Sequence, residues 1–386
     1  MNRILVTLLS VACMGTLACK ADQLIIGEYA LDDGGADARG DTYLIPATCG
    51  NGIIDPGEEC DLGASNGGSN CDGTCKVVTV VTIPTPDPPG VVTLASGQND
   101  PQVIALDSTS VYWANWGDYN SANGSVMKVS VDGGTPVTLV PNLKAPGGIA
   151  VDNTSVYWAG GLSDGTWSLT KTPLVGGAGI ALSSAFRNDP IVVGGGRVFG
   201  SGTDVISVPI NGGPVTTLAP AHPTLSGQMS YGYSVDDTYL YWVSFTAPSF
   251  VMKIPLGGGV ATTLATLPGT GFGTAVDATS VYIATAGGVM KVSKSGGAPT
   301  TLAAESGAGI ATDAKNVYWT VWSDPGSVNM VSVNGGQVTT LATEQHQPWG
   351  IAVDATNVYW VNGGIQGQMG TGSVMKLALS NSAGGG

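Results

Sequence analysis

Charged residues, histidine and cysteine are scarce in this sequence, and each scarcity narrows what the protein can be. Only 11% of the 386 residues are charged, the formal net charge is −14, and His222 and His346 are the only histidines. A basic nucleic-acid-binding surface and a histidine-rich metal centre are therefore not expected. No cysteine follows residue 75. Disulfide bonds are thus confined to the N-terminal part of the chain.

Residues 1–18 are typical of an export signal. Arg3 supplies a short basic region, residues 4–18 form an apolar stretch, and Cys19 follows Thr-Leu-Ala. The stretch is shorter than the ~20 residues that cross a bilayer, so we expect cleavage rather than a membrane span. The Thr-Leu-Ala-Cys ending resembles a bacterial lipobox, which implies acylation of Cys19. Lys20 is similar to the residue found there in lipoproteins sorted to the outer membrane. Ordinary signal-peptidase cleavage is the alternative.

Four cysteines gather between residues 49 and 75, and in an exported chain we expect two disulfide bonds. They are Cys49, Cys60, Cys71 and Cys75. Three pairings are open, and the sequence does not choose among them. The segments CGNGIIDPGEECDLG and CDGTC resemble the cysteine-rich repeat of myxobacterial surface proteins, although Leu62 replaces a usual acidic residue. We expect a tether over 19–48, the cysteine module over 49–75 and a proline-rich linker over 76–90.

The cysteine module also concentrates oxygen-bearing side chains within a short stretch of chain. They are Asn51, Asp55, Glu58, Glu59 and Asp61. Calcium prefers hard oxygen ligands, and a loop held by disulfides lowers the cost of gathering them. A calcium site is one hypothesis. The other is a solvated acidic turn whose order comes from the disulfide bonds alone.

A short aromatic motif recurs seven times after residue 90. It begins at Val111, Val156, Val198, Leu240, Val281, Val317 and Val358, mostly as Val-Tyr-Trp. The successive spacings are 45, 42, 42, 41, 36 and 41 residues. A period of about 40 residues that is built from short β-rich runs is typical of the blades of a β-propeller.

Each period contains four strand-like runs in the same order, which predicts four-stranded antiparallel blades. The outermost run, of the type Val-Thr-Leu-Ala, is missing after residue 379, and one extra copy stands at 91–95. We therefore predict an all-β fold, a seven-bladed β-propeller over 91–386 in which strand 91–95 completes the last blade and closes the ring. Gly194 and Gly200 depart from the pattern in the third repeat. A six-bladed ring with one distorted repeat is the alternative.

The runs GIAVDNTSVYW (148–158) and GIAVDATNVYW (350–360) resemble the YWTD and NHL classes of extracellular propeller repeat, within the broader TolB-like group. The resemblance covers residues 91–386. It implies the architecture but no single activity, because these families include receptors, scaffolds, lactonases and lyases.

Residues that recur at one position of the repeat are expected to serve the architecture rather than a site. The tryptophans of the aromatic motif should fill the space between blades. Aspartates at the end of the first strand should accept backbone N–H bonds in the following turn: Asp107, Asp152, Asp236, Asp277, Asp313 and Asp354. Lysines of the third strand are predicted to be surface residues: Lys128, Lys171, Lys253, Lys291 and Lys376.

Unrepeated residues are better candidates for function, and the meander places them together. Connections from strand two to strand three and from blade to blade share one face and vary in length. The candidate binding residues there are Trp116, Tyr119, Trp167, Trp322, Trp349, Asp118, Asp324, Glu344 and His346. Exposed aromatic rings among polar groups suit a sugar ring or a protein loop. The alternative is that several of these rings only cap the blades.

Taken together, these features predict a monomeric lipoprotein at the outer membrane or cell surface that displays a propeller as a binding module. Its expected partner is a cell-surface polysaccharide or protein, and no catalytic residue is assigned. The alternative is an extracellular lactonase or lyase that uses the axial funnel of the same face, with His346 and Glu344 as candidate groups.

Overall fold

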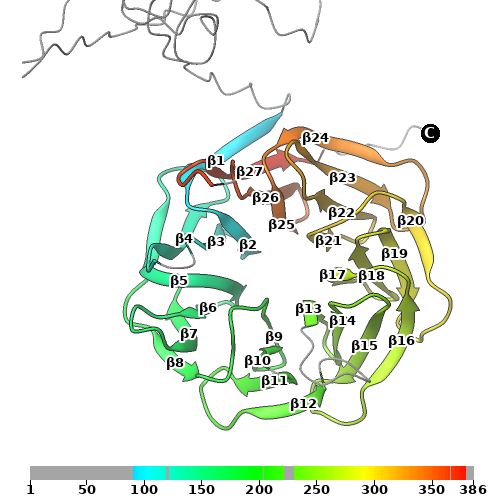
Figure 1. Cartoon of the computed structure of the whole chain (residues 1–386), viewed down its shortest axis with the longest axis horizontal. Helices are drawn as coiled ribbons and strands as arrows, with labels where there is room; N and C mark the ends of the chain where they lie inside the picture. Colours follow the sequence, from blue (N-terminus) through cyan, green and yellow to red (C-terminus); the bar gives the residue numbers. More distant parts are fainter. Residues whose placement is uncertain (1–89, 119–120, 203, 221–229, 366, 380–386) are drawn as a thin grey trace, which may run out of the picture. The chain divides into compact units, whose positions relative to one another are not determined.

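The computed structural model describes residues 90–118, 121–202, 204–220, 230–365 and 367–379, which form strands and loops around a central axis (Figure 1). Within these ranges the chain forms no helix that could cross a membrane. The export signal, Cys19, the tether, the cysteine module with its calcium hypothesis, and the linker up to residue 89 lie outside the described residues. Tyr119 does too.

The strands are arranged as seven blades. Five sheets have four strands each, and a sixth has seven strands in the order β2-β3-β4-β5-β6-β7-β8. That larger sheet contains two blades, because β5 (Val137–Val151) continues from the outer strand of blade 1 into the inner strand of blade 2. The seven-bladed prediction is confirmed, and the six-bladed alternative is wrong, since the third repeat forms a full blade.

In each blade the first strand lies nearest the axis (Figure 1). Blade 1 contains β2 (Pro101–Leu106), β3 (Ser110–Asn115), β4 (Gly124–Ser130) and the first half of β5. Blade 2 contains the second half of β5, then β6 (Ser155–Gly161), β7 (Trp167–Pro173) and β8 (Ile180–Ser183). Blade 3 contains β9 (Val192–Gly194), β10 (Arg197–Ser201), β11 (Asp204–Pro209) and β12 (Thr216–Pro220).

The remaining blades follow the same order. Blade 4 contains β13 (Ser230–Val235), β14 (Tyr239–Ser244), β15 (Ser249–Pro255) and β16 (Thr262–Leu267). Blade 5 contains β17 (Gly271–Val276), β18 (Ser280–Thr285), β19 (Gly288–Ser293) and β20 (Thr300–Ala303). Blade 6 contains β21 (Ile310–Thr312), β22 (Asn316–Val321), β23 (Gly326–Ser332) and β24 (Thr339–Gln345). Blade 7 contains β25 (Pro348–Val353), β26 (Asn357–Asn362), β27 (Gly372–Ala378) and β1 (Val91–Gln98).

The ring closes in blade 7, where the first strand of the described chain joins the last three. Strand β1 pairs antiparallel with β27, from Val91 opposite Leu377 to Gln98 opposite Gly372. The predicted closing strand is therefore confirmed, and it continues past the predicted end at residue 95. The pairing covers the edge that β27 would otherwise expose.

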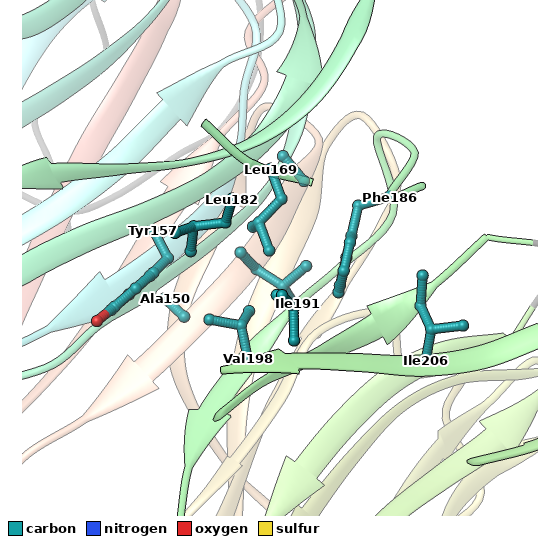
Figure 2. Close-up of a cluster of buried hydrophobic side chains, with 10 residues drawn as sticks. Ala150, Tyr157, Leu169, Leu182, Phe186, Ile191, Val198 and Ile206 are labelled. Atoms are coloured by element: carbon teal, nitrogen blue, oxygen red, sulfur yellow. The ribbon is translucent and has the colours of Figure 1, made fainter. Parts of the chain in front are cut away.

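The hydrophobic core lies between neighbouring blades rather than at the axis. In the cluster of Figure 2, Tyr157 and Leu169 of blade 2 pack with Val198 and Ile206 of blade 3. Four tryptophans of the aromatic motif are fully buried in equivalent positions: Trp113, Trp242, Trp319 and Trp360. Their predicted role as filling between blades is confirmed, because each is part of a cluster that joins two blades.

The repeated aspartates are confirmed as turn residues and have an additional partner. In blade 2, Oδ1 of Asp152 accepts bonds from the backbone N–H groups of Thr154 and Ser155, at 2.8 and 2.9 Å. Its Oδ2 accepts a bond from the Tyr157 hydroxyl at 2.7 Å. Burial raises the pKa of the Asp152 carboxyl, but the bonds from Tyr157 and the turn outweigh burial and lower it. The Asp152 carboxylate is thus ionised and engaged within its own blade.

The repeated lysines, which were predicted to be surface residues, are only partly exposed and bond the next blade. Each is half-buried, and its Nζ donates to a backbone carbonyl of the next blade. The bonds are Lys128 to Leu174, Lys171 to Ile210, Lys253 to Lys294, Lys291 to Val333, and Lys376 to Val131. A long lysine side chain can lie along the sheet and place its charge at a carbonyl in the adjacent blade. The last of these bonds crosses the ring closure.

Candidate binding face

The connections from strand two to strand three and from blade to blade lie on one side of the ring, which we name the variable face. Their lengths differ, as the long connection between β3 and β4 and the short one between β18 and β19 illustrate. The face is therefore built on equivalent strand ends, but each blade presents different side chains there. Binding residues are commonly carried by such loops on a rigid scaffold.

Four predicted residues meet on this face between blades 6 and 7. The rings of Trp322 and Trp349 pack edge to face, with centroids 5.6 Å apart and planes at 85°. His346 Nδ1 lies 2.7 Å from Asp324 Oδ1. Trp322 is 55% exposed, and the His346 and Asp324 side chains are 50% and 35% exposed. We name these four residues the Trp322 cluster.

The backbone that carries the Trp322 cluster is shaped by two residues in the left-handed region. Glu344 has φ 57° and Gln347 has φ 51°. The Gln347 N–H donates to the Ser323 carbonyl at 3.1 Å, which ties the two loops together. Asn142 and Ala145 adopt the same pair of conformations at the junction of blades 1 and 2. The loop conformation thus recurs, while the residues that give the cluster its chemistry do not.

Trp116 occupies the position in blade 1 that Trp322 occupies in blade 6, since each stands three residues after a buried tryptophan of its second strand. The equivalent of Trp349 in blade 2 is Gly147. A Cβ at Gly147 would lie 2.9 Å from Trp116 Cζ3, so the indole packs directly against this glycine. Trp116 is therefore half-buried and less available than Trp322.

A second aromatic pair on the variable face was missed by the sequence reasoning. Phe245 follows β14 and Phe272 lies in β17, and their rings pack at 5.7 Å with an interplanar angle of 61°. Strand register places them at the positions of Trp322 and Trp349, at the junction of blades 4 and 5. Phe245 stands three residues after Trp242, and that spacing was the available signal.

The other predicted residues lie elsewhere on the ring. Trp167 is half-buried at the start of β7, opposite Gly161. Asp118 is exposed in blade 1, where its Oδ2 accepts a bond from the Ser121 hydroxyl at 3.1 Å. Glu344 is exposed two residues before His346, but the carboxylate that bonds His346 is Asp324. The pairing of His346 with Glu344 in the enzyme hypothesis therefore changes to His346 with Asp324.

Among the residues that the structure describes, no group of three or more His, Cys, Asp or Glu side chains could hold a metal ion. A shallow hollow between the outer strand of blade 1 and blade 2 is lined by Val140, Leu143, Trp158, Leu162 and other residues. The Trp322 cluster combines one exposed and one half-buried ring with an acid and an imidazole. Such a surface can stack on a ligand and exchange hydrogen bonds with it.

The fold and this face define the chain as a β-propeller protein. Among solved structures it is similar to a puromycin-hydrolyzing peptidase of Mycobacterium tuberculosis, with a TM-score of 0.54 and 13% identity over 75% of this chain and 55% of that one. The WD40 β-propeller domain of Doa1 has a TM-score of 0.52 and 14% identity, covering 75% and 97%. BamB from Moraxella catarrhalis has a TM-score of 0.50 and 12% identity, covering 74% and 99%.

These similarities concern the fold alone, because the sequence identities are only 12%, 13% and 14%. The chain spans about half the length of the peptidase. No protein-family model and no curated protein matches the sequence. Similarity of fold alone does not specify a function, which depends on the residues of the variable face.

Proposed function

We propose that the protein is a surface-anchored binding module that engages a glycan or a protein through the variable face of its propeller. The observation that carries the proposal is the Trp322 cluster. Its two indole rings stand nearly perpendicular, so that half-buried Trp349 supports Trp322, whose ring is open to a ligand. A tryptophan that is 55% exposed beside a second aromatic ring is an unusual use of apolar surface in a soluble domain.

The scaffold suits recognition because the loops that carry the cluster are held on a closed ring. Tryptophan has only two side-chain torsions, and its large ring loses little conformational freedom on binding. Polar groups at the edge of an aromatic patch supply orientation through hydrogen bonds. In the Trp322 cluster, Asp324 and His346 are the polar groups that can form such hydrogen bonds.

The N-terminal segments complete the proposal. An export signal over 1–18, a lipid on Cys19 and a disulfide-bonded spacer over 49–75 would present the propeller at the outer membrane or cell surface. A polysaccharide or protein of that surface is the expected partner. Calcium in the cysteine module stays a prediction, to be tested by calorimetric titration of the exported chain.

The test is capture from envelope extract with the full mature chain carrying serine at position 19 to remove the lipid. Trp322→Ala and Trp349→Ala should each reduce capture of the bound species at least tenfold, since an aromatic anchor contributes about 2 kcal/mol or more. Val175→Ala is the matched control, because Val175 is 89% exposed and lies in a turn on the opposite face. Equal capture by all variants would refute the binding role of the cluster.

A second candidate function rests on the contact between His346 and Asp324. A histidine whose Nδ1 is held by a carboxylate can use Nε2 to accept or donate a proton, as in hydrolases and lyases. In that case His346→Asn should abolish turnover of a lactone or polysaccharide substrate, while Trp322→Ala should mainly raise KM. Activity that survives His346→Asn would remove this candidate.

A further inference from the structure

The Trp322 cluster belongs to a series of positions that the ring repeats. The first position of the series stands three residues after the last residue of the Val-Tyr-Trp motif in the second strand, as Trp116 does after Trp113. The second position lies near the start of the first strand of the next blade. Strand register gives the pairs Trp116–Gly147, Phe245–Phe272, Ala286–Ala308, Trp322–Trp349 and Gly363–Gln102. Two junctions therefore carry aromatic pairs, while another carries two alanines.

We propose that the Phe245–Phe272 pair is a second subsite, and that the ligand is an extended neutral polysaccharide that contacts both aromatic pairs. This inference rests on the proposed binding function and adds the class of ligand. The two pairs occupy equivalent register positions, at the junction of blades 4 and 5 and at the junction of blades 6 and 7. A ligand that repeats its own chemistry can use two equivalent subsites.

The chemistry of the pairs favours sugar rings. Phe245 is 36% exposed and Trp322 is 55% exposed, so each pair leaves one ring open to solvent. The C–H face of a sugar can stack on such a ring, because the face of the aromatic system is electron-rich. Carboxylate oxygens accept bonds from sugar hydroxyls, and exposed Asp324 stands two residues after Trp322 in the same loop.

The charge of the protein indicates a neutral polymer. The chain carries a formal net charge of −14, and the segments that carry the Trp322 pair bear Asp324, Glu344 and His346. An acidic polysaccharide would approach this surface against electrostatic repulsion. Hydroxyl groups of a neutral glycan instead act as donors to the same carboxylates.

Two subsites on one rigid ring should give binding that depends on ligand length. When a polymer is held at one subsite, the second contact is intramolecular, and the combined affinity can exceed either single affinity by about 10²-fold or more. A disaccharide can occupy only one subsite. Removal of the phenylalanine pair should therefore weaken polymer binding and leave disaccharide binding at the Trp322 pair intact.

The experiment is affinity electrophoresis of the full chain without its lipid in gels that contain dextran, laminarin or hydroxyethylcellulose, with polygalacturonate as the acidic polymer. We expect retardation by at least one neutral polymer. Phe245→Ala and Phe245→Leu should weaken that binding about tenfold or more, and should change the affinity for the corresponding disaccharide less than twofold. The leucine variant keeps an apolar side chain at the position, so it separates loss of stacking from loss of folding.

Val260→Ala is the control, because Val260 is 86% exposed in blade 4 and lies away from the variable face. Polymer binding that is lost with Trp322→Ala but unchanged in both Phe245 variants would overturn the second subsite and leave the proposed function standing. Retardation by polygalacturonate alone, or by none of the four polymers, would overturn the choice of a neutral glycan. Capture of a protein from envelope extract would then still support the proposed binding function.

Discussion

Replacing Gln98 with methionine removes one buried amide from the point where the ring closes. Gln98 ends β1, the outer strand of blade 7, but its Oε1 accepts two bonds from blade 1. The donors are Trp113 Nε1 at 2.9 Å and Asn115 Nδ2 at 3.0 Å. All three side chains are buried. Methionine has a similar length and an apolar end, so the substitution removes the acceptor with little change in packing.

The magnitude follows from what each donor retains. Asn115 Nδ2 still has Ser125 Oγ at 3.1 Å, whereas the single indole N–H of Trp113 donates to Gln98. The unsatisfied buried donor of Trp113 costs about 1–3 kcal/mol, and the lost bond from Asn115, whose amide keeps another acceptor, removes about 1 kcal/mol more. We therefore expect the free energy of unfolding to fall by about 2–4 kcal/mol.

The assay is urea unfolding of the full chain, followed by near-ultraviolet circular dichroism, with the midpoint compared at constant slope. Gln345→Met is a built-in repeat of the experiment, because Gln345 Oε1 accepts equivalent bonds from Trp360 and Asn362 at 2.9 Å each. The two variants should lose similar stability. A loss below about 0.5 kcal/mol in both would refute the reasoning, because it would mean that the indole N–H groups find other acceptors.

Three further predictions concern other contacts between and within blades. Burial raises the pKa of Asp236, but bonds from Lys294, the turn and Tyr241 outweigh burial and lower the pKa to about 2. The stability that the Asp236 carboxylate contributes is therefore present above its unfolded pKa of about 3.9, and it is lost as the pH falls from about 4 to about 2. Asp236→Asn should therefore flatten the loss of stability in that window, measured as urea midpoints between pH 2 and 5, and an unchanged slope would contradict this account. Lys376→Met removes the 2.8 Å bond to the Val131 carbonyl across the closure and should lower the free energy of unfolding by about 1–2 kcal/mol. Blade 6 carries Met330 at the equivalent position, so packing should tolerate the methionine. An unshifted urea midpoint would show that the bond contributes nothing. Gly147→Ala would place a Cβ 1.8 Å from the Asn188 carbonyl oxygen and 2.9 Å from the Trp116 ring, and should lower the free energy of unfolding by about 2–3 kcal/mol. Gly257→Ala is the control, because a Cβ there meets nothing within 4 Å. Equal urea midpoints for the two variants would refute the clash.

The architecture could be predicted because its determinants are local and repeated. Strand alternation and the aromatic motif recur in all seven repeats and the turn aspartate in six of them, and each repeat forms one blade. Even the closing strand was predictable, because one copy of the outer run stood ahead of the first blade. An unpaired edge at the end of the chain then had one obvious partner.

The candidate site was predicted only in part. The pairing of Trp322 with Trp349, and of His346 with Asp324, joins loops that follow different strands, and sequence reasoning could place these residues only on the same face. Phe245 and Phe272 were overlooked, because each looks like an ordinary loop or strand residue until blade register aligns it with Trp322 and Trp349. The bonds of the lysines were missed for the same reason, since their partners lie in the next blade.

By itself, the sequence determined the number of blades, the strand order, the segment that closes the ring, and the separation of repeated from unrepeated residues. These properties depend on side-chain periodicity and turn chemistry, which act over a few neighbouring residues. Only the tertiary structure decided which side chains meet across a blade junction. Such contacts join residues that lie far apart in the chain, as Lys376 and Val131 do at a separation of 245 positions. They exist only once neighbouring blades have packed against each other, because that packing sets which side chains meet.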